Sequence, residues 1–292
     1  MSAVIEIKNL SKFYGKQRGI EGVSFSVYQG EIFGFIGPNG AGKSTAIRTL
    51  LALFEPTGGS ASIFGKDCVK AASEIAQDVG YLPSEVAYYD NMKVKELLTY
   101  TSALYKKNCT ERIDVLCHQL NLDQSRKIAN LSFGNKKKVG IVSALLHSPK
   151  LIILDEPTGG LDPLVQQTFF EILKEENNRG ATIFFSSHIL SEVQRFCQRV
   201  AILKEGKLIS IGQIKELTEN GYKKVSVTAK NVIPADYFKT DNIAQLVQDG
   251  ASASFMYKGD VDSLFQKIAK LGITDAFVEE PTLEEIFLHY YK

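Results

Sequence analysis

A glycine-rich run near the N-terminus is the strongest chemical signal in the sequence. It fits the pattern G-x-x-x-x-G-K-[ST] and reads Gly37, Pro38, Asn39, Gly40, Ala41, Gly42, Lys43, Ser44, Thr45. An apolar strand precedes it, and a helix is predicted over residues 46–53. Glycines let successive backbone N–H groups wrap the oxygens of a triphosphate, and the helix N-terminus adds partial positive charge. We therefore expect Lys43 to reach the β- and γ-phosphates and Ser44 to offer its hydroxyl to Mg²⁺.

Two adjacent carboxylates follow the apolar run 151–154, where a buried strand is predicted to end. Asp155 is expected to hold Mg²⁺ through water, and Glu156 to orient or deprotonate an attacking water molecule. On their own, neighbouring acids at the end of a strand more often mark a solvated turn. The phosphate-binding run upstream favours the catalytic interpretation instead.

Shorter motifs stand around these two in a recognisable order. Tyr14 precedes the glycine-rich run, and the segment 131–135 reads LSFGN. The loop 159–162 follows the two acids, and His188 follows the next apolar strand. With this ordered series the sequence resembles the ABC ATPase family, whose signature motif reads LSGGQ.

The resemblance covers the chain from about Ile5 to Leu217 and implies roles that spacing alone does not show. Tyr14 would stack on the adenine of ATP, and His188 would act in catalysis by holding the γ-phosphate and the attacking water. In this family two ATPase subunits meet head to tail, and each ATP lies between them. The residues that would touch the nucleotide from these later motifs are Ser132, Gly134, Asn135 and Asp162.

Each of these motifs has a plainer structural alternative. Tyr14 alone would more often be a half-buried aromatic, and His188 alone an ordinary hydrogen-bonded histidine. Asp162 stands before Pro163 and could simply cap a helix. The ordered context favours the functional interpretation for these three residues. A helix is predicted from Lys136, and its lysines 136–138 are expected to form a solvated face.

The sequence departs from the family pattern at three positions. Ser84 stands where the family has a glutamine that contacts Mg²⁺ or water, Asn135 replaces the last glutamine of the signature, and Gly159 replaces a serine. None of these changes removes the phosphate-binding lysine or a catalytic carboxylate. We therefore expect ATP hydrolysis to be retained but slow. The alternative, that the protein senses ATP without hydrolysing it, is supported only by Ser84.

The elements that must position these residues read as an α/β fold, a P-loop NTPase core with a mostly parallel sheet. Runs 5–10 and 23–27 alternate as antiparallel edge strands do, and 200–203 with 207–211 reads as a hairpin. Short apolar runs at 31–36, 79–82, 151–154 and 182–185 are typical of strands buried on both faces. Residues 1–218 are predicted to form this nucleotide-binding domain, with a helical subdomain at about 86–146.

The composition changes near residues 218–222, and 222–292 is predicted to be a small α+β domain. Strands are expected at 225–228, 253–257 and 276–278, with a helix at 261–271. A final helix is signalled by Thr282, whose hydroxyl can cap the first turn while Glu285 reaches back.

The bulk composition restricts the possible partners. The 292 residues carry a net charge of +1 without a basic tail, so nucleic acid is not expected as a partner. Four dispersed cysteines fit free thiols in a reducing cytosol. No secretory signal and no apolar stretch of roughly 18–20 residues is found, so a membrane role would need a partner.

The tail 280–287, EPTLEEIF, resembles the end of ATPase subunits from the ABC-2 type exporter group, which serves drug, bacteriocin and peptide-antibiotic efflux. The resemblance implies a cytoplasmic protein at the inner face of the membrane, partnered by integral membrane permease subunits and a second ABC ATPase subunit, identical or different. Permease docking is expected at 86–95, although Tyr88, Tyr89 and Met92 would equally suit core packing. ABC-type ATPases of DNA repair or the ribosome are the alternative, but this chain has one ATPase copy, no heptads and no zinc cysteines.

Overall fold

The computed structural model describes residues 2–218, 222–240, 242–282 and 285, which fall into two compact units. The first unit is Met1–Ile211 and the second is Gly212–Lys292. The short helix α8 (Ile214–Thr218) thus belongs with the second unit, ahead of the boundary expected at residues 218–222. Within the described residues, no helix is both long and apolar enough to cross a bilayer.

A six-stranded sheet forms the centre of the first unit, in the order β10-β9-β3-β8-β7-β6. Strands β6 to β9 pair in parallel with their neighbours or with β3, which confirms the mostly parallel sheet. Parallel strands end at the same edge, so the segments after β3, β6, β7 and β8 are brought together. The bounds are β3 (Ile32–Ile36), β6 (Val79–Leu82), β7 (Leu151–Asp155), β8 (Thr182–Ser187), β9 (Arg199–Lys204) and β10 (Lys207–Gln213).

A second, antiparallel sheet with the order β2-β1-β4-β5 packs against the first through an aromatic cluster. Phe25 stacks on Phe33 at 5.4 Å between ring centroids, and Phe184 lies 5.8 Å from Phe33. Strands β4 and β5 were not predicted, because GGSASI has few of the residues that favour strands and β5 has only two residues; β4 is held by pairing with β1 and, over two residues, with β5. The bounds are β1 (Ala3–Tyr14), β2 (Gln17–Tyr28), β4 (Gly58–Ile63) and β5 (Lys66–Asp67).

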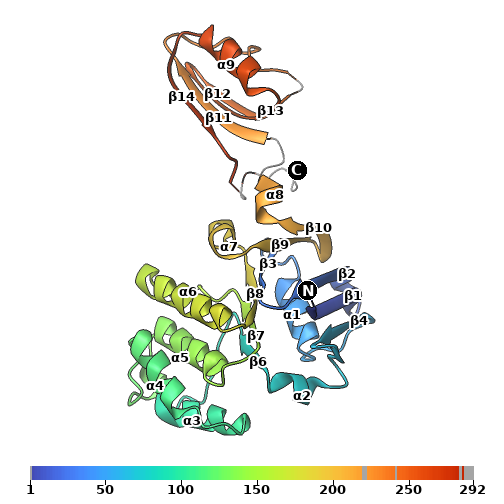
Figure 1. The fold of residues 1–292 in the computed structure, drawn as a ribbon, viewed down its shortest axis with the longest axis vertical. Coiled ribbons are helices and arrows are strands. Elements are labelled where there is room, and N and C mark those ends of the chain that lie inside the picture. The colour runs from blue at the N-terminus through green and yellow to red at the C-terminus, as the bar shows by residue number, and fades with distance from the viewer. Residues whose placement is uncertain (1, 219–221, 241, 283–284, 286–292) are drawn as a thin grey trace. The chain divides into compact units, whose positions relative to one another are not determined.

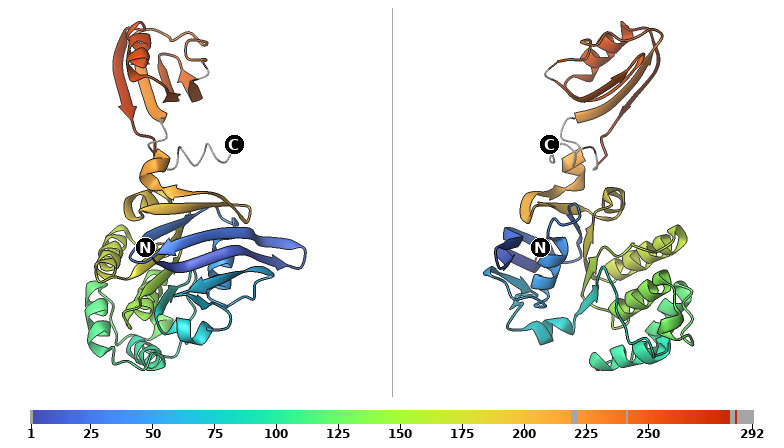
Figure 2. Two further views of the ribbon diagram at one scale, coloured as in Figure 1. Left: turned by 45° about the vertical axis from the view of Figure 1, so that its right-hand side comes forward. Right: turned by 180° about the vertical axis from the view of Figure 1, so that it is seen from behind.

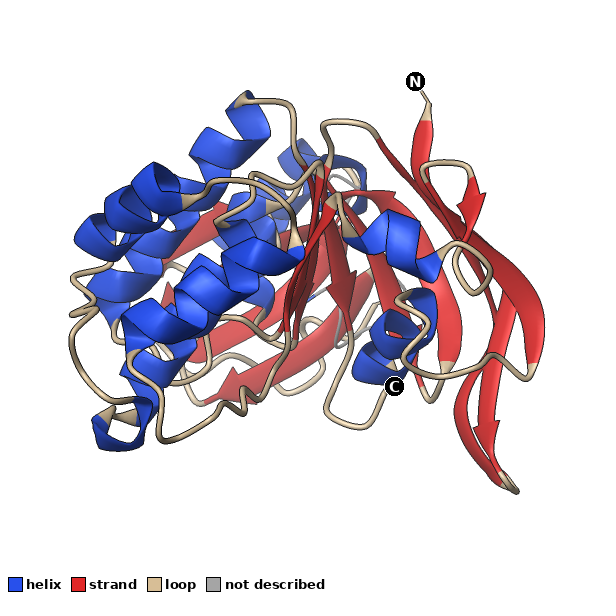
Figure 3. Ribbon diagram, turned by 90° about the horizontal axis from the view of Figure 1, so that it is seen from below, coloured by secondary structure: helices blue, strands red, loops and turns tan. Residues whose placement is uncertain are grey.

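Helices cover the central sheet on both faces. Figures 1 and 3 show α3 to α6 on one side, and α1 on the other side with the β1–β2 layer. The bounds are α1 (Lys43–Leu50), α2 (Ala72–Ala76), α3 (Val94–Leu104), α4 (Thr110–Gln119), η1 (Ile128–Asn130), α5 (Phe133–Leu145), α6 (Pro163–Asn178) and α7 (Leu190–Phe196).

Two helices begin earlier than predicted. In both cases the residue just before the helix, and not the apolar pattern, determines where the first turn begins. Helix α1 begins at Lys43 rather than 46, after Gly42 in a left-handed conformation. Helix α5 begins at Phe133 rather than Lys136, because the Ser132 hydroxyl accepts a hydrogen bond from the amide of Asn135 at 3.3 Å.

The second unit contains a four-stranded antiparallel sheet in the order β12-β13-β11-β14, with α9 on one face (Figure 2). Its core is built around Phe238 and Phe255, whose ring centroids are 4.5 Å apart. Of the predicted last helix, both capping hydrogen bonds between Thr282 and Glu285 are present, and the rest lies outside the described residues. The bounds are β11 (Tyr222–Ala229), β12 (Ile243–Asp249), β13 (Ser252–Lys258), α9 (Val261–Ala269) and β14 (Ile273–Glu279); β12 was not predicted.

The helical subdomain is tied to the core by a buried ion pair, which gives a stability prediction. Glu176 of α6, 2% exposed, contacts Arg112 of α4 and, at 2.8 Å, Arg179. Replacing Glu176 by glutamine leaves the Arg112 guanidinium without its counter-charge, so the free energy of unfolding should fall by about 2–4 kcal/mol. Glu175→Gln, which removes a half-exposed partner 3.6 Å from Arg179, should cost less than about 1 kcal/mol. Equal losses for the two variants in urea unfolding would contradict this assignment.

Candidate active site

A cavity of about 550 Å³ opens at the carboxyl edge of the central sheet. It brings together segments that follow β3, β6 and β7, together with Tyr14 from the end of β1. Seven of the predicted nucleotide-binding residues line it: Tyr14, Asn39, Gly40, Gly42, Lys43, Ser44 and Thr45. The cavity also includes Ser84 and Glu156, and three residues that no motif indicated, Gln17, Arg18 and Gly19.

The backbone of the glycine-rich run is closely packed against its neighbours. Gly42 has φ +102°, and a Cβ atom there would lie 2.4 Å from the carbonyl oxygen of Gly19. A Cβ on Gly37 would lie 2.4 Å from the carbonyl oxygen of Leu203. Both positions therefore require glycine for space, and Gly42 also for its backbone conformation.

Lys43 is the group on which this cavity is centred. Its side chain is 4% exposed, and its Nζ donates to the carbonyl oxygens of Gly37 at 2.8 Å and Pro38 at 3.1 Å. The same Nζ lies 3.1 Å from Oε1 of Glu156, and Nδ1 of His188 lies 3.3 Å from that oxygen. The three residues predicted to act in catalysis are thus in contact around one carboxylate oxygen.

The carboxylate of Glu156 is held in its charged form. Burial acts to raise its pKa, but the hydrogen bonds and charges of Lys43 and His188 act in the opposite direction, and the pKa is lowered overall. Glu156 adopts φ +48°, unusual for a residue other than glycine, so the chain turns sharply as it leaves β7. Its amide donates to the carbonyl of Ser186 at 3.1 Å, which anchors that turn.

Within the described part of the chain, Asp155 has one carboxylate oxygen without a hydrogen-bond partner, which a hydrated divalent cation would satisfy. It is fully buried, and its Oδ1 accepts a hydrogen bond from the Ser186 hydroxyl at 2.8 Å. Its Oδ2 is buried too, and no described residue donates to it. A buried carboxylate oxygen left without a partner is costly, and water held by a hard cation would satisfy it. Asp155 does not line the cavity itself, but its neighbour Glu156 and the Ser44 hydroxyl do, and the oxygen atoms of Asp155 and Ser44 are of the kind that Mg²⁺ prefers.

The signature residues lie elsewhere. Among the described residues, Ser132, Gly134 and Asn135 are not part of the cavity lining; they form the first turn of α5. A Cβ on Gly134 would lie 2.8 Å from the carbonyl oxygen of Gly160, so this turn packs closely on the loop after the acids. Asp162 caps α6 by accepting from the amide of Val165 at 3.0 Å, which matches the structural alternative considered for it.

The prediction of a solvated face for lysines 136–138 is wrong at Lys137. This side chain is fully buried, and its Nζ donates to carbonyl oxygens of Ser84 and Pro83 at 2.8 and 3.0 Å. Three consecutive lysines indicated an exposed helix face, but the packing of α5 places the Lys137 side chain against the segments that follow β6 and β7.

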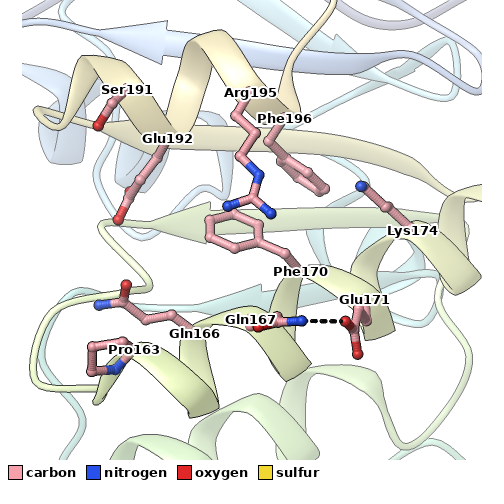
Figure 4. A pocket seen from close by; sticks show the side chains of 10 residues that line it. All are labelled: Pro163, Gln166, Gln167, Phe170, Glu171, Lys174, Ser191, Glu192, Arg195 and Phe196. Carbon is pink, nitrogen blue, oxygen red and sulfur yellow. Dashed lines mark hydrogen bonds between the residues drawn. The ribbon is translucent and has the colours of Figure 1, made fainter.

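Glu192 of α7 is a further residue that no motif indicated. Its Oε2 accepts hydrogen bonds from Thr158 at 3.1 Å and from Ser187 at 3.2 Å. It therefore joins the loop after the two acids to the residue before His188. Burial raises the pKa of Glu192. It also lines a cavity of about 360 Å³ between α6 and α7, together with Phe170 and Arg195 (Figure 4).

The packing at Gly42 leads to a test of the phosphate-binding run. Gly42→Ala should weaken Mg·ATP binding by at least about tenfold, because the new methyl group meets the Gly19 carbonyl and the left-handed backbone is strained. Gly180→Ala is the matched control, since Gly180 has φ +99° with no neighbour within 4 Å. Titration with a fluorescent ATP analogue measures both variants, and unaltered binding by Gly42→Ala would refute the assignment.

Comparisons with known proteins agree on one family. The model of the ABC transporter family matches residues 20–159. The bacitracin transport ATP-binding protein BcrA of Bacillus licheniformis is 34% identical, over 99% of this chain and 97% of that protein. The linearmycin resistance ATP-binding protein LnrL of Bacillus subtilis (strain 168) is 30% identical, over 98% of this chain and 97% of that protein. A solved ATP-binding subunit of an ABC transporter is 34% identical with a TM-score of 0.71, over 74% of this chain and 92% of that one. The chain belongs to the ATP-binding, ATP-hydrolysing subunits of ABC transporters.

Proposed function

We propose that this subunit hydrolyses ATP at the cavity around Lys43 and that hydrolysis powers an exporter. The observation that carries the catalytic part is the contact of Lys43, Glu156 and His188 around one carboxylate oxygen. An anionic carboxylate beside a buried ammonium and an imidazole is an arrangement that can bind a phosphate and direct a water molecule at it.

In this proposal each group has one task. Tyr14, 43% exposed, stacks on the adenine, while the amides of 37–45 and the Lys43 ammonium hold the phosphates. Asp155 and Ser44 would hold Mg²⁺, which when bound would neutralise charge on the phosphates. Glu156 orients the attacking water and accepts its proton, and His188 keeps the carboxylate and the water in place.

The position of the signature residues supports an active form with two subunits. Ser132, Gly134 and Asn135 form a helix N-terminus that is not part of its own chain's cavity, and Phe133 beside them is 58% exposed. A second subunit, identical or different, would bring the same helix end to the γ-phosphate. Only ATP carries that phosphate, so hydrolysis would release the pair.

This arrangement predicts a dimer that depends on ATP. Glu156→Gln removes the catalytic base and should trap ATP, so that this variant elutes as a dimer with Mg·ATP and as a monomer with Mg·ADP. The double variant Glu156→Gln, Ser132→Arg should not form the dimer, because a large side chain would replace the Ser132 hydroxyl at the helix end that is proposed to contact the γ-phosphate of the other subunit's ATP. Ser125→Arg, at an exposed position of the same subdomain, serves as the control. A monomer under every condition in size-exclusion chromatography would contradict dimerisation of identical subunits.

Export is the direction that the relatives and the tail support. Two relatives are described as a bacitracin transport and a linearmycin resistance protein, and the tail 280–287 resembles exporter subunits. We infer that the subunit lies at the cytoplasmic face of the membrane, bound to integral permease subunits that carry a drug, peptide or lipid-like cargo. Growth of cells with and without the transporter on such antibiotics tests the cargo class.

The segment 86–95 offers the contact surface for a permease. Tyr88 is largely buried, and burial raises its pKa, which fits core packing. Tyr89 is 68% exposed, and the exposed Asp90 lies 3.3 Å from Lys136. Core packing therefore applies to Tyr88, whereas Tyr89 is free to serve as a docking residue. We propose that Tyr89 and Asp90 contact a cytoplasmic helix of the permease.

Removal of these two side chains should weaken recruitment to the membrane. Tyr89→Ala combined with Asp90→Lys should lower the amount bound to permease-containing vesicles at least about tenfold, as loss of an aromatic anchor and a charge does at interfaces. ATP binding should stay normal. Tyr100→Ala, which removes a tyrosine 52% exposed on α3, is the control. Recruitment equal to the control in a flotation assay would count against this surface.

A further inference from the structure

Lys137 is a buried cation that the catalytic scheme above does not use. It lies in helix α5 between two lysines that are partly exposed, and Lys136 reaches Asp90 at 3.3 Å. Lys137 itself has no exposed surface. A methionine would fill such a slot without the cost of burying a charge, so packing alone does not account for an ammonium group here.

The contacts of the ammonium join three segments of the site. Its Nζ donates to the carbonyl oxygens of Ser84 at 2.8 Å and Pro83 at 3.0 Å, and lies 3.5 Å from the carbonyl oxygen of Glu156. Ser84 lines the nucleotide cavity, and Glu156 carries the catalytic carboxylate. All three N–H groups of the ammonium can thus be directed at main-chain oxygens, two of which belong to residues that line the cavity.

The main chain of Glu156 is held from both ends. Its amide donates to the carbonyl of Ser186, and its own carbonyl faces Lys137. Since Glu156 adopts φ +48°, these contacts fix an unusual turn that sets where its carboxylate lies. Deletion of one contact would let the turn relax towards common backbone angles.

Charge adds to this geometry. Burial lowers the pKa of Lys137 to about 8, and the negative charges of Asp155 and Glu156, the charged groups that act on it, oppose that shift. The segment after β6 presents carbonyl oxygens to it. The ammonium therefore loses its proton not far above neutral pH, much earlier than an exposed lysine would.

We propose that Lys137 is a positioning residue for ATP hydrolysis, which clamps the backbone of Glu156 to the Pro83–Ser84 segment and so holds the catalytic carboxylate in line. This inference rests on the proposed role of Glu156. It makes α5 a direct link between the signature motif at its start and the water-activating group of its own subunit. Ser84, too short to replace the family's glutamine, is on this account held by its main chain instead.

The test compares Lys137→Gln with Lys138→Gln, a partly exposed neighbour on the same helix, in the full chain with Mg·ATP. For Lys137→Gln, kcat should fall about tenfold or more. A well-positioned general base accelerates a reaction by roughly 10²–10⁴-fold, and misplacing Glu156 should remove part of that acceleration. The Kd for ATP should stay within about twofold of the unmodified protein, because the ammonium contacts no cavity-lining side chain that holds the phosphates. Lys138→Gln should change neither quantity. A kcat within about twofold of normal, or a Kd weakened in step with kcat, would overturn the proposal.

A second measurement needs no substitution and decides the question if Lys137→Gln fails to fold. In the unmodified protein kcat/KM should fall as pH rises through about 8, because deprotonation weakens the clamp. A profile that stays flat up to pH of about 9.5 would contradict the proposal. Glu156→Gln separates the two ideas: if it still hydrolyses ATP, the role of Glu156 fails, whereas an inactive Glu156→Gln beside a fully active Lys137→Gln refutes the clamp alone.

Discussion

The ammonium group of Lys43 sits where a parallel sheet, a glycine-rich turn and a helix N-terminus meet, and the rest of the site is arranged around it. Two carbonyls of the turn and the carboxylate of Glu156 satisfy it at 2.8–3.1 Å while it is almost fully buried. A cation in this setting is expensive unless it is paired. A triphosphate would offer it stronger partners and would release Glu156 to act on water. The contacts seen here are therefore those of a site prepared for an anion.

Two lysines contact Glu156, one at its side chain and one at its main chain. Lys43 contacts the carboxylate, and Lys137 faces the main-chain carbonyl of the same residue. One lysine comes from the phosphate-binding helix and the other from the helix that begins with the signature motif. Glu192 adds a link between the loop after the acids and the residue before His188. Glu156 is thus in contact with the phosphate-binding helix, with α5 and with His188.

The order of the motifs and the buried parallel strands could be read from the sequence, because both are local patterns with a fixed period or spacing. Strand β4 could not, since its glycines and serines have little strand preference of their own and form a strand by pairing with β1 and β5. The burial of Lys137 was missed because a run of lysines usually indicates an exposed helix face. Which lysine of the run is buried depends on how α5 packs against β6, and this cannot be read from the sequence. The helix starts were misplaced because Gly42 and Ser132 act through cap geometry. The separation of the signature residues from the cavity depends on tertiary distance, which no spacing in the sequence encodes.

The central claim is that the Lys43 ammonium and the turn around it grip the phosphates of ATP. Calorimetric titration of Mg·ATP into the unmodified protein and into Lys43→Ala measures this most directly. The account predicts clear saturable binding to the first and a loss of affinity of about 100-fold or more in the second, since a buried charge-assisted contact to an anion is removed. Equal affinity in the two proteins would contradict it.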